Sequence, residues 1–177
     1  MLTIDRDASC LFVVDFQSRL MPAIPEAAAA VAQATRLLQA ARLLDVPVLV
    51  TEQNPKGLGA TVPDLPVEGR PVLHKMSFDA TREAGFAAAC PDRPAVVVAG
   101  CEAHVCVLQT VLGLLDGGRQ VYVARDAVAA RRPESKETAL ARMARHGAEI
   151  VTTEMVLFEW LGSAEHPRFR DAIALVK

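Results

Sequence analysis

Residues 10–16 of the chain read Cys-Leu-Phe-Val-Val-Asp-Phe, an apolar and partly β-branched run with one acid, Asp15, near its end. A run of this kind is typical of a strand buried on both faces of a parallel sheet, where polar and apolar side chains need not alternate. Similar runs follow at 46–51, 71–74, 95–99, 120–124 and 149–152. The sequence therefore predicts six strands.

Helical patterns separate most of these strands. The clearest covers 26–44, where Val31, Ala34, Leu38 and Ala41 share one helical face. Further helices are expected over 79–89, 104–116 and 133–146. Because parallel strands are joined by crossovers of about a dozen residues, this alternation indicates a doubly wound α/β fold: a mostly parallel sheet with helices on both faces.

Length and composition limit the classes of protein that this chain can represent. Its 177 residues fit a single domain over 1–177, and 51% hydrophobic with 23% charged residues is typical of a globular protein rather than a disordered one. The formal net charge of −2 provides no basic field for a phosphate backbone, so nucleic acid is not an expected partner.

The sequence also shows no sign of a membrane or metal partner. No apolar run approaches the roughly 18–20 residues of a membrane span, and Asp5, Arg6 and Asp7 stand where a signal peptide would be basic and then apolar, so we expect a cytoplasmic protein. The four cysteines form no CxxC pair and the four histidines have no zinc-ligand spacing. We therefore expect free thiols and neither a metal nor a cofactor.

Three reactive side chains follow predicted strands. In an open α/β sheet the ligand cleft lies beyond the carboxyl ends of the strands, and Asp15, Lys75 and Cys106 come at or shortly after such ends. A carboxylate at the end of a buried strand needs a cation or hydrogen-bond donors, and Lys75 is a candidate cation. Asp15 and Lys75 could also have ordinary roles, Asp15 as a turn residue and Lys75 as a solvated side chain.

Cys106 lies in the first turn of the helix expected from His104. There, unpaired backbone N–H groups and the helix dipole favour a thiolate over a thiol, and the same N–H groups can bind an oxyanion. The alternative is a small buried apolar side chain, which is the commonest role of a free cysteine. The segment alone leaves both possibilities open.

Taken together, these motifs resemble the isochorismatase-like cysteine hydrolases, a superfamily that includes nicotinamidases and N-carbamoylsarcosine amidohydrolases. The resemblance rests on Asp15-Phe-Gln17, on Lys75, on Gly100-Cys-Glu-Ala-His-Val-Cys106 and on Val123-Ala-Arg-Asp-Ala127. The stretch Thr51-Glu-Gln-Asn-Pro-Lys-Gly-Leu-Gly59 resembles a small, functionally uncharacterised subgroup. The resemblance implies one isochorismatase-like hydrolase domain over 1–177, with strand order 3-2-1-4-5-6.

The resemblance also implies a catalytic triad of Asp15, Lys75 and Cys106. Asp15 would accept the thiol proton, Lys75 would stabilise the thiolate and hold the carboxylate, and Cys106 would attack a carbonyl carbon to form a thioester. The backbone N–H groups of Glu102 and Cys106 would form the oxyanion hole, beside a cis peptide bond between Cys101 and Glu102.

Two departures from the family narrow the implied function. Glu52-Gln53-Asn54 stands where nicotinamidases have an Asp-x-His metal motif, which disfavours a nicotinamidase. True isochorismatases do not use the cysteine nucleophile, so the presence of Cys106 disfavours vinyl-ether hydrolysis. What remains is a hydrolase of the C–N bond of a small amide or carbamoyl substrate.

Other expectations concern the pocket and the rival functions. Phe16, Gln17 and Phe78 are candidate pocket residues beside a long loop over 52–70, although either phenylalanine could belong to the core. A catalytically silent, oligomeric scaffold and a redox-sensitive Cys106 thiol with Cys101 as its partner are the alternatives. The apolar segment 105–115 favours a homo-oligomer, a dimer or larger, in either case.

Overall fold

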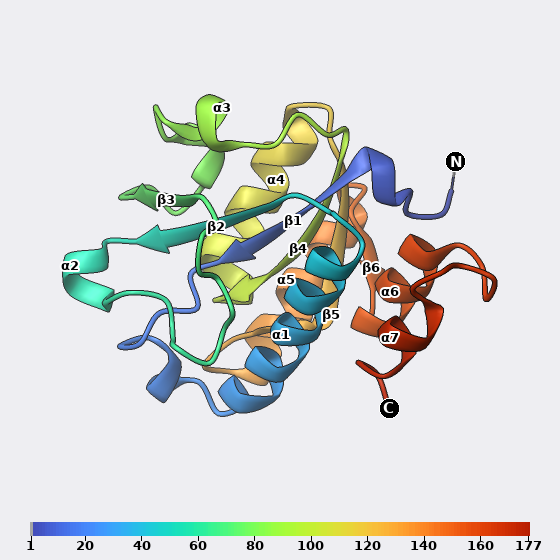
Figure 1. The fold of residues 1–177 in the computed structure, drawn as a ribbon. Coiled ribbons are helices and arrows are strands. Elements are labelled where there is room, and N and C mark those ends of the chain that lie inside the picture. Colours follow the sequence, from blue (N-terminus) through green and yellow to red (C-terminus); the bar gives the residue numbers. More distant parts are fainter. Residues whose placement is uncertain (1) are drawn as a thin grey trace.

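A computed structural model of the chain describes residues 2–177 and is built on one six-stranded sheet (Figure 1). All neighbouring strands are parallel, and their order is β3-β2-β1-β4-β5-β6. The strands are β1 (Ser9–Val14), β2 (Val48–Gln53), β3 (Val72–Lys75), β4 (Ala95–Cys101), β5 (Gln120–Ala129) and β6 (Glu149–Val151). The predicted doubly wound α/β fold and its strand order are confirmed.

Helices cover both faces of this sheet. They are α1 (Ala27–Leu43), α2 (Pro55–Leu58), α3 (Phe86–Ala89), α4 (Leu108–Asp116), α5 (Pro133–Arg145), α6 (Thr153–Leu161) and α7 (Phe169–Ile173). Short 3₁₀ turns occur at Arg6–Ala8, Met21–Ala23 and Ala80–Arg82, and a π-helical turn, η4, spans Ala103–Val107. Helices α1, α6 and α7 pack on one face of the sheet, and α3, α4 and α5 pack on the other (Figure 1).

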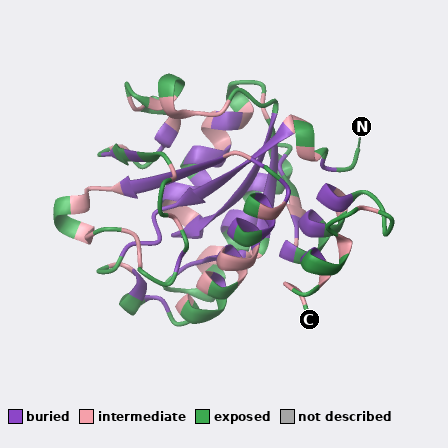
Figure 2. Ribbon diagram, in the orientation of Figure 1, coloured by how far each residue is buried: buried purple, intermediate pink, exposed green. Residues whose placement is uncertain are grey.

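The central strand β1 explains why the sheet needs two helical layers. All six of its residues are buried, and the middle of the sheet is buried throughout (Figure 2). Leu11 and Val13 belong to the core beneath α1, whereas Phe12 and Val14 belong to the core beneath α4 and α5. A strand that is apolar at successive positions must be covered on both faces, as the opening motif predicted.

Two helical predictions need correction. The expected helix over 79–89 is interrupted: a 3₁₀ turn at Ala80–Arg82 is capped by Asp79, whose side chain accepts from Thr81 N, and α3 begins only after Gly85. Helix α6 was not predicted, because its sequence is apolar nearly all round and shows little helical periodicity. Its boundaries follow known rules, with Thr152 accepting from Met155 N at the start and Gly162 in the left-handed region at the end.

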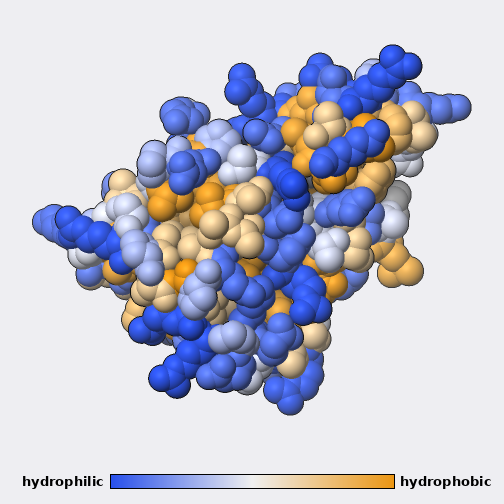
Figure 3. All heavy atoms as spheres, turned by 90° about the horizontal axis from the view of Figure 1, so that it is seen from below, coloured by the Kyte–Doolittle hydropathy of each residue, from blue (hydrophilic) through white to orange (hydrophobic). Residues whose placement is uncertain are grey.

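The segment expected as a long loop is mostly irregular. Strand β2 runs on to Gln53, the single turn of α2 follows, and the chain then returns without a further helix or strand to β3. At the surface, apolar areas are bordered by hydrophilic side chains (Figure 3). None of the helices formed by residues 2–177 combines the length and apolar character of a membrane span.

Candidate active site

The carboxyl ends of β1, β3 and β4 carry the three reactive side chains. Asp15 directly follows β1, Lys75 is the last residue of β3, and Cys106 lies in η4, just after β4. Gly100 lets β4 approach β1 at this edge, because a Cβ at Gly100 would lie 2.6 Å from both the Cβ and the carbonyl oxygen of Val14. No other residue fits between these two strand ends without displacing the backbone.

Asp15 has an unusual backbone conformation. Its φ of 53° lies in the left-handed region, which costs free energy for a residue with a side chain and is often found at functional sites. Two hydrogen bonds hold it there: Asp15 N–H donates to Thr51 O at 3.1 Å, and Gln17 N–H donates to Asp15 O at 2.9 Å. The surrounding chain therefore imposes the direction in which the Asp15 carboxylate points.

The Asp15 carboxylate forms a buried ion pair with Lys75. Lys75 Nζ donates to Asp15 Oδ2 at 2.7 Å, and the side chains of both residues are 0% exposed. The other carboxylate oxygen, Oδ1, accepts from the Thr51 hydroxyl at 2.7 Å. A cation and a hydroxyl thus satisfy both oxygens of a carboxylate that is fully removed from water.

A short segment after β3 encloses the Lys75 ammonium group. Lys75 Nζ donates to the carbonyl oxygens of Ser77 at 3.2 Å and Phe78 at 3.3 Å. The segment is tied to α4 by buried Thr110, whose hydroxyl accepts from Ala80 N–H at 3.1 Å and donates to Phe78 O at 3.4 Å. The helix that follows Cys106 therefore also positions Lys75.

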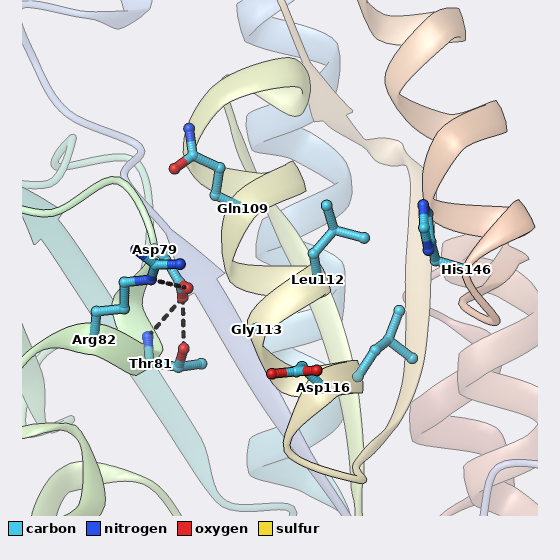
Figure 4. Close-up of a pocket in the computed structure, with 9 residues that line it drawn as sticks. Asp79, Thr81, Arg82, Gln109, Leu112, Gly113, Asp116 and His146 are labelled. Atoms are coloured by element: carbon cyan, nitrogen blue, oxygen red, sulfur yellow. Dashed lines mark hydrogen bonds and ion pairs between the residues drawn. The ribbon is translucent and has the colours of Figure 1, made fainter.

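Gly113 allows the same segment to contact α4. A Cβ at this position would lie 2.4 Å from Thr81 Oγ1 and 2.7 Å from both carboxylate oxygens of Asp79. Asp79, Thr81, Arg82 and His146 help to line a cavity of about 680 Å³. Figure 4 shows the first three residues on one side of α4 and His146 on the other. Asp15, Lys75 and Cys106 do not line this cavity, so it is separate from these three side chains.

Cys106 lies beside the ion pair and is only 7% exposed. Burial raises the pKa of its thiol well above the usual value; the Asp15 charge raises the pKa further, and the nearby Lys75 charge lowers it. Because both charges act on this pKa, Asp15 and Lys75 lie near the sulfur. The sequence left a reactive and a merely structural Cys106 open; burial favours the protonated thiol, because desolvation outweighs the favourable effect of Lys75.

The turn that carries Cys106 is π-helical rather than α-helical. The Cys101–Glu102 peptide bond is cis, as the resemblance implied. The N–H groups of Val105 and Val107 donate to Glu102 O at 3.0 Å and 3.3 Å. Local π-helical turns occur frequently at functional sites, and this one places the backbone N–H groups of Glu102 and Cys106 at the start of the α4 helical segment.

The structure does not support all three candidate pocket residues. Phe16 is fully buried in the core beneath α1, so it offers no surface to a substrate. Gln17 is also fully buried: its amide donates to Gln53 O and Gly59 O and accepts from Gln53 N–H, which fastens the loop after β2. Phe78, at 48% exposed and next to the lysine, stays a candidate.

Sequence reasoning gave no role to Thr51 and Thr110. Thr51 ends a run of apolar residues and lies opposite Val14, the last residue of β1, which Asp15 follows; the pairing of these two strands could therefore have revealed the contact. Thr110 stands four residues after Cys106 as a polar residue within an apolar helix, which is a weaker signal. Among residues 2–177, no group of three His, Cys, Asp or Glu side chains is arranged to hold a metal ion.

Known proteins share both the sequence and the fold. The Isochorismatase domain family matches residues 9–155. Human isochorismatase domain-containing protein 2 is 40% identical over 173 residues, which cover 96% of this chain and 83% of that protein. The Salmo salar isochorismatase domain-containing protein 1 is 39% identical over 94% of this chain and 60% of its own length.

Among solved structures, the MAR1 ribonuclease from Caenorhabditis elegans superimposes with a TM-score of 0.93 at 36% identity, covering 98% of this chain and 92% of that one. The match to the family covers all six strands and the Asp15, Lys75 and Cys106 positions. By sequence and by fold, the chain belongs to the isochorismatase family of hydrolases.

Proposed function

We propose that the protein hydrolyses the C–N bond of a small amide or carbamoyl compound, with Cys106 as nucleophile, Asp15 as general base and Lys75 as the cation that holds Asp15. The observation that carries this proposal is the buried Asp15–Lys75 ion pair beside the Cys106 thiol. A carboxylate that is fully desolvated yet kept charged next to a neutral thiol is well placed to accept its proton.

The raised pKa of the Cys106 thiol determines the order of events. The resting sulfur keeps its proton, and Asp15 accepts this proton as the sulfur attacks the substrate carbonyl carbon. The N–H groups of Glu102 and Cys106 stabilise the tetrahedral oxyanion. The C–N bond then breaks, and Asp15 donates the proton to the leaving nitrogen.

The second half of the reaction removes the acyl group from sulfur. Asp15, again a carboxylate, accepts a proton from water as the water oxygen attacks the thioester carbon. The C–S bond breaks and the proton returns to Cys106. Throughout both halves, Lys75 stabilises the charge on Asp15 through the 2.7 Å contact, and Thr51 orients the other oxygen.

Two experiments test this function. A screen of small amides and carbamoyl compounds for ammonia release should give turnover that Cys106→Ala abolishes. Independently of the natural substrate, p-nitrophenyl acetate should acylate Cys106 and release about one nitrophenolate per chain in an initial burst. A burst of equal size in Cys106→Ala would refute the assigned nucleophile, and no burst from the wild type would favour a catalytically silent scaffold.

RNA hydrolysis is the competing activity, because the Caenorhabditis elegans neighbour carries the name of a ribonuclease. A net charge of −2 does not favour binding to a phosphate backbone. Incubation of the same wild-type and Cys106→Ala preparations with RNA should therefore give no cleavage. Cleavage that Cys106→Ala abolishes would replace the proposed substrate class with RNA.

We also propose that the protein forms a homo-oligomer through the segment that contains η4 and α4. Val105, Leu112 and Leu115 are apolar and only partly buried in the isolated chain. The YcaC gene product of Escherichia coli, which shares this fold at 22% identity and a TM-score of 0.87, is described as an octameric hydrolase of unknown specificity. Light scattering of the purified protein should therefore show an oligomer. A monomer would reject the proposal.

A further inference from the structure

The N–H group of Glu102 is assigned to the oxyanion hole, and the side chain of Glu102 is held by Arg131, which follows β5. Its carboxylate is buried, with 7% of the side chain exposed. Arg131 Nε donates to both oxygens at 3.0 Å, and Arg131 N–H donates to Oε2 at 2.8 Å. Arg131 follows β5 by two residues, so this contact joins the start of the nucleophile turn to the end of the neighbouring strand.

The backbone of Glu102 is held as well. Its carbonyl oxygen accepts from the N–H groups of Val105 and Val107, and these bonds fix it to the turn that carries Cys106. Side chain and carbonyl are thus fixed from two directions. The N–H of the same residue consequently has little freedom to rotate relative to the sulfur.

We infer that the Glu102–Arg131 ion pair positions the oxyanion hole, an inference that rests on the proposed function. An oxyanion donor must lie about 2.7–3.1 Å from the developing charge, so a small rotation of Glu102 weakens its contribution. The pair does not contact the Asp15–Lys75 ion pair: the partners of the Glu102 carboxylate both come from Arg131, and those of Asp15 come from Thr51 and Lys75. Glu102 and Arg131 therefore position the N–H group of the oxyanion hole and not the Asp15 carboxylate.

This separation gives the inference a selective test with two probes. Alkylation of Cys106 by iodoacetamide displaces iodide and forms no oxyanion, so it reports only on the sulfur and its surroundings. Acylation by p-nitrophenyl acetate passes through a tetrahedral oxyanion. A variant that disturbs only the oxyanion hole should slow the second reaction and leave the first unchanged.

The variants are Arg131→Met and Glu102→Gln, with Arg132→Met as the matched control. Arg131 has a side chain that is 58% exposed, so its replacement leaves the core intact. Arg132 is an exposed neighbour. Because the complete loss of an oxyanion donor typically slows a reaction about 100–1,000-fold, a misplaced donor should slow acylation about 10–100-fold.

We expect Arg131→Met and Glu102→Gln to slow acylation to this extent while alkylation at pH 8.5 stays within about twofold of the wild type. Arg132→Met should change neither rate. The double variant Glu102→Gln/Arg131→Met should be no slower than Glu102→Gln alone, because both changes act on the same ion pair. Should Glu102→Gln fold poorly, Arg131→Met still decides the question.

The outcomes separate this inference from the proposed function. If the wild type shows no Cys106-dependent burst, the proposed function fails. If the wild type shows the burst and Arg131→Met acylates at the wild-type rate, the function stands and the positioning role is refuted. Equal slowing of acylation and alkylation would also refute it, because the contact would then support the whole turn rather than the oxyanion hole.

Discussion

The replacement Lys75→Met tests how strongly the buried ion pair contributes to the fold. Methionine is similar to lysine in length and shape, so the change removes the ammonium group while leaving little cavity. Asp15 would retain only the Thr51 hydroxyl as a side-chain partner and would be a buried charge without a counter-ion. Breaking a buried pair in this way costs about 3–5 kcal/mol, a large part of the roughly 5–15 kcal/mol that holds a typical protein folded.

Urea unfolding followed by circular dichroism would measure this cost. Lys56→Met is a suitable control, since Lys56 is exposed and such surface changes usually stay within about 0.5 kcal/mol. The double variant Asp15→Asn/Lys75→Met should recover part of the loss, because it leaves no buried charge unpaired. A cost below about 1 kcal/mol for Lys75→Met, or no recovery in the double variant, would refute the reasoning.

Three further predictions concern Gly113, Thr51 and two buried thiols. Gly113→Ala should destabilise the protein in the same urea assay, because overpacking against Thr81 and Asp79 costs about 1–3 kcal/mol while the better helix propensity of alanine returns about 1 kcal/mol. The control Gly85→Ala should be nearly neutral, because its Cβ would lie 3.4 Å from Leu73. Thr51→Val should cost about 1.5–3 kcal/mol by removing a hydrogen bond to a charged group, and it should slow acylation by p-nitrophenyl acetate; unchanged values would contradict the Asp15 geometry. Burial raises the pKa of Cys10 and of Cys101 from 9.0 to about 12, so above pH 9 the folded state keeps protons that the unfolded state loses. The free energy of unfolding should therefore fall between pH 9 and 12 by about 1.4 kcal/mol per pH unit for each thiol. A flat profile would show that these thiols are solvated.

The reactivity of Cys106 adds a test of its environment. Because the pKa of this thiol lies above the usual range, its alkylation by iodoacetamide should rise about tenfold per pH unit from pH 7 to 9. A plateau in the wild type below pH 8 would show a depressed pKa instead.

The sequence by itself determined the class of fold and the candidates for chemistry. Runs such as 10–16 and 95–99 predicted buried parallel strands because their apolar residues do not alternate with polar ones. The principle that ligands meet strand carboxyl ends then made Asp15, Lys75 and Cys106 candidates, and the resemblance to the family implied that they act as a triad. These signals are local, so they can be read without knowing where any segment lies in space.

Only the tertiary structure decided how those residues act on one another. The contact between Asp15 and Lys75 joins residues 60 positions apart, and the contacts of Thr51, Thr110 and Arg131 depend equally on which strands and helices are neighbours. The helix start that favours a thiolate at Cys106 is visible in the sequence, whereas the desolvation that raises the pKa of this thiol depends on everything packed around the sulfur. Local patterns specify which reactive groups are present. Burial and charge pairing, which arise from non-local packing, determine the chemistry of those groups.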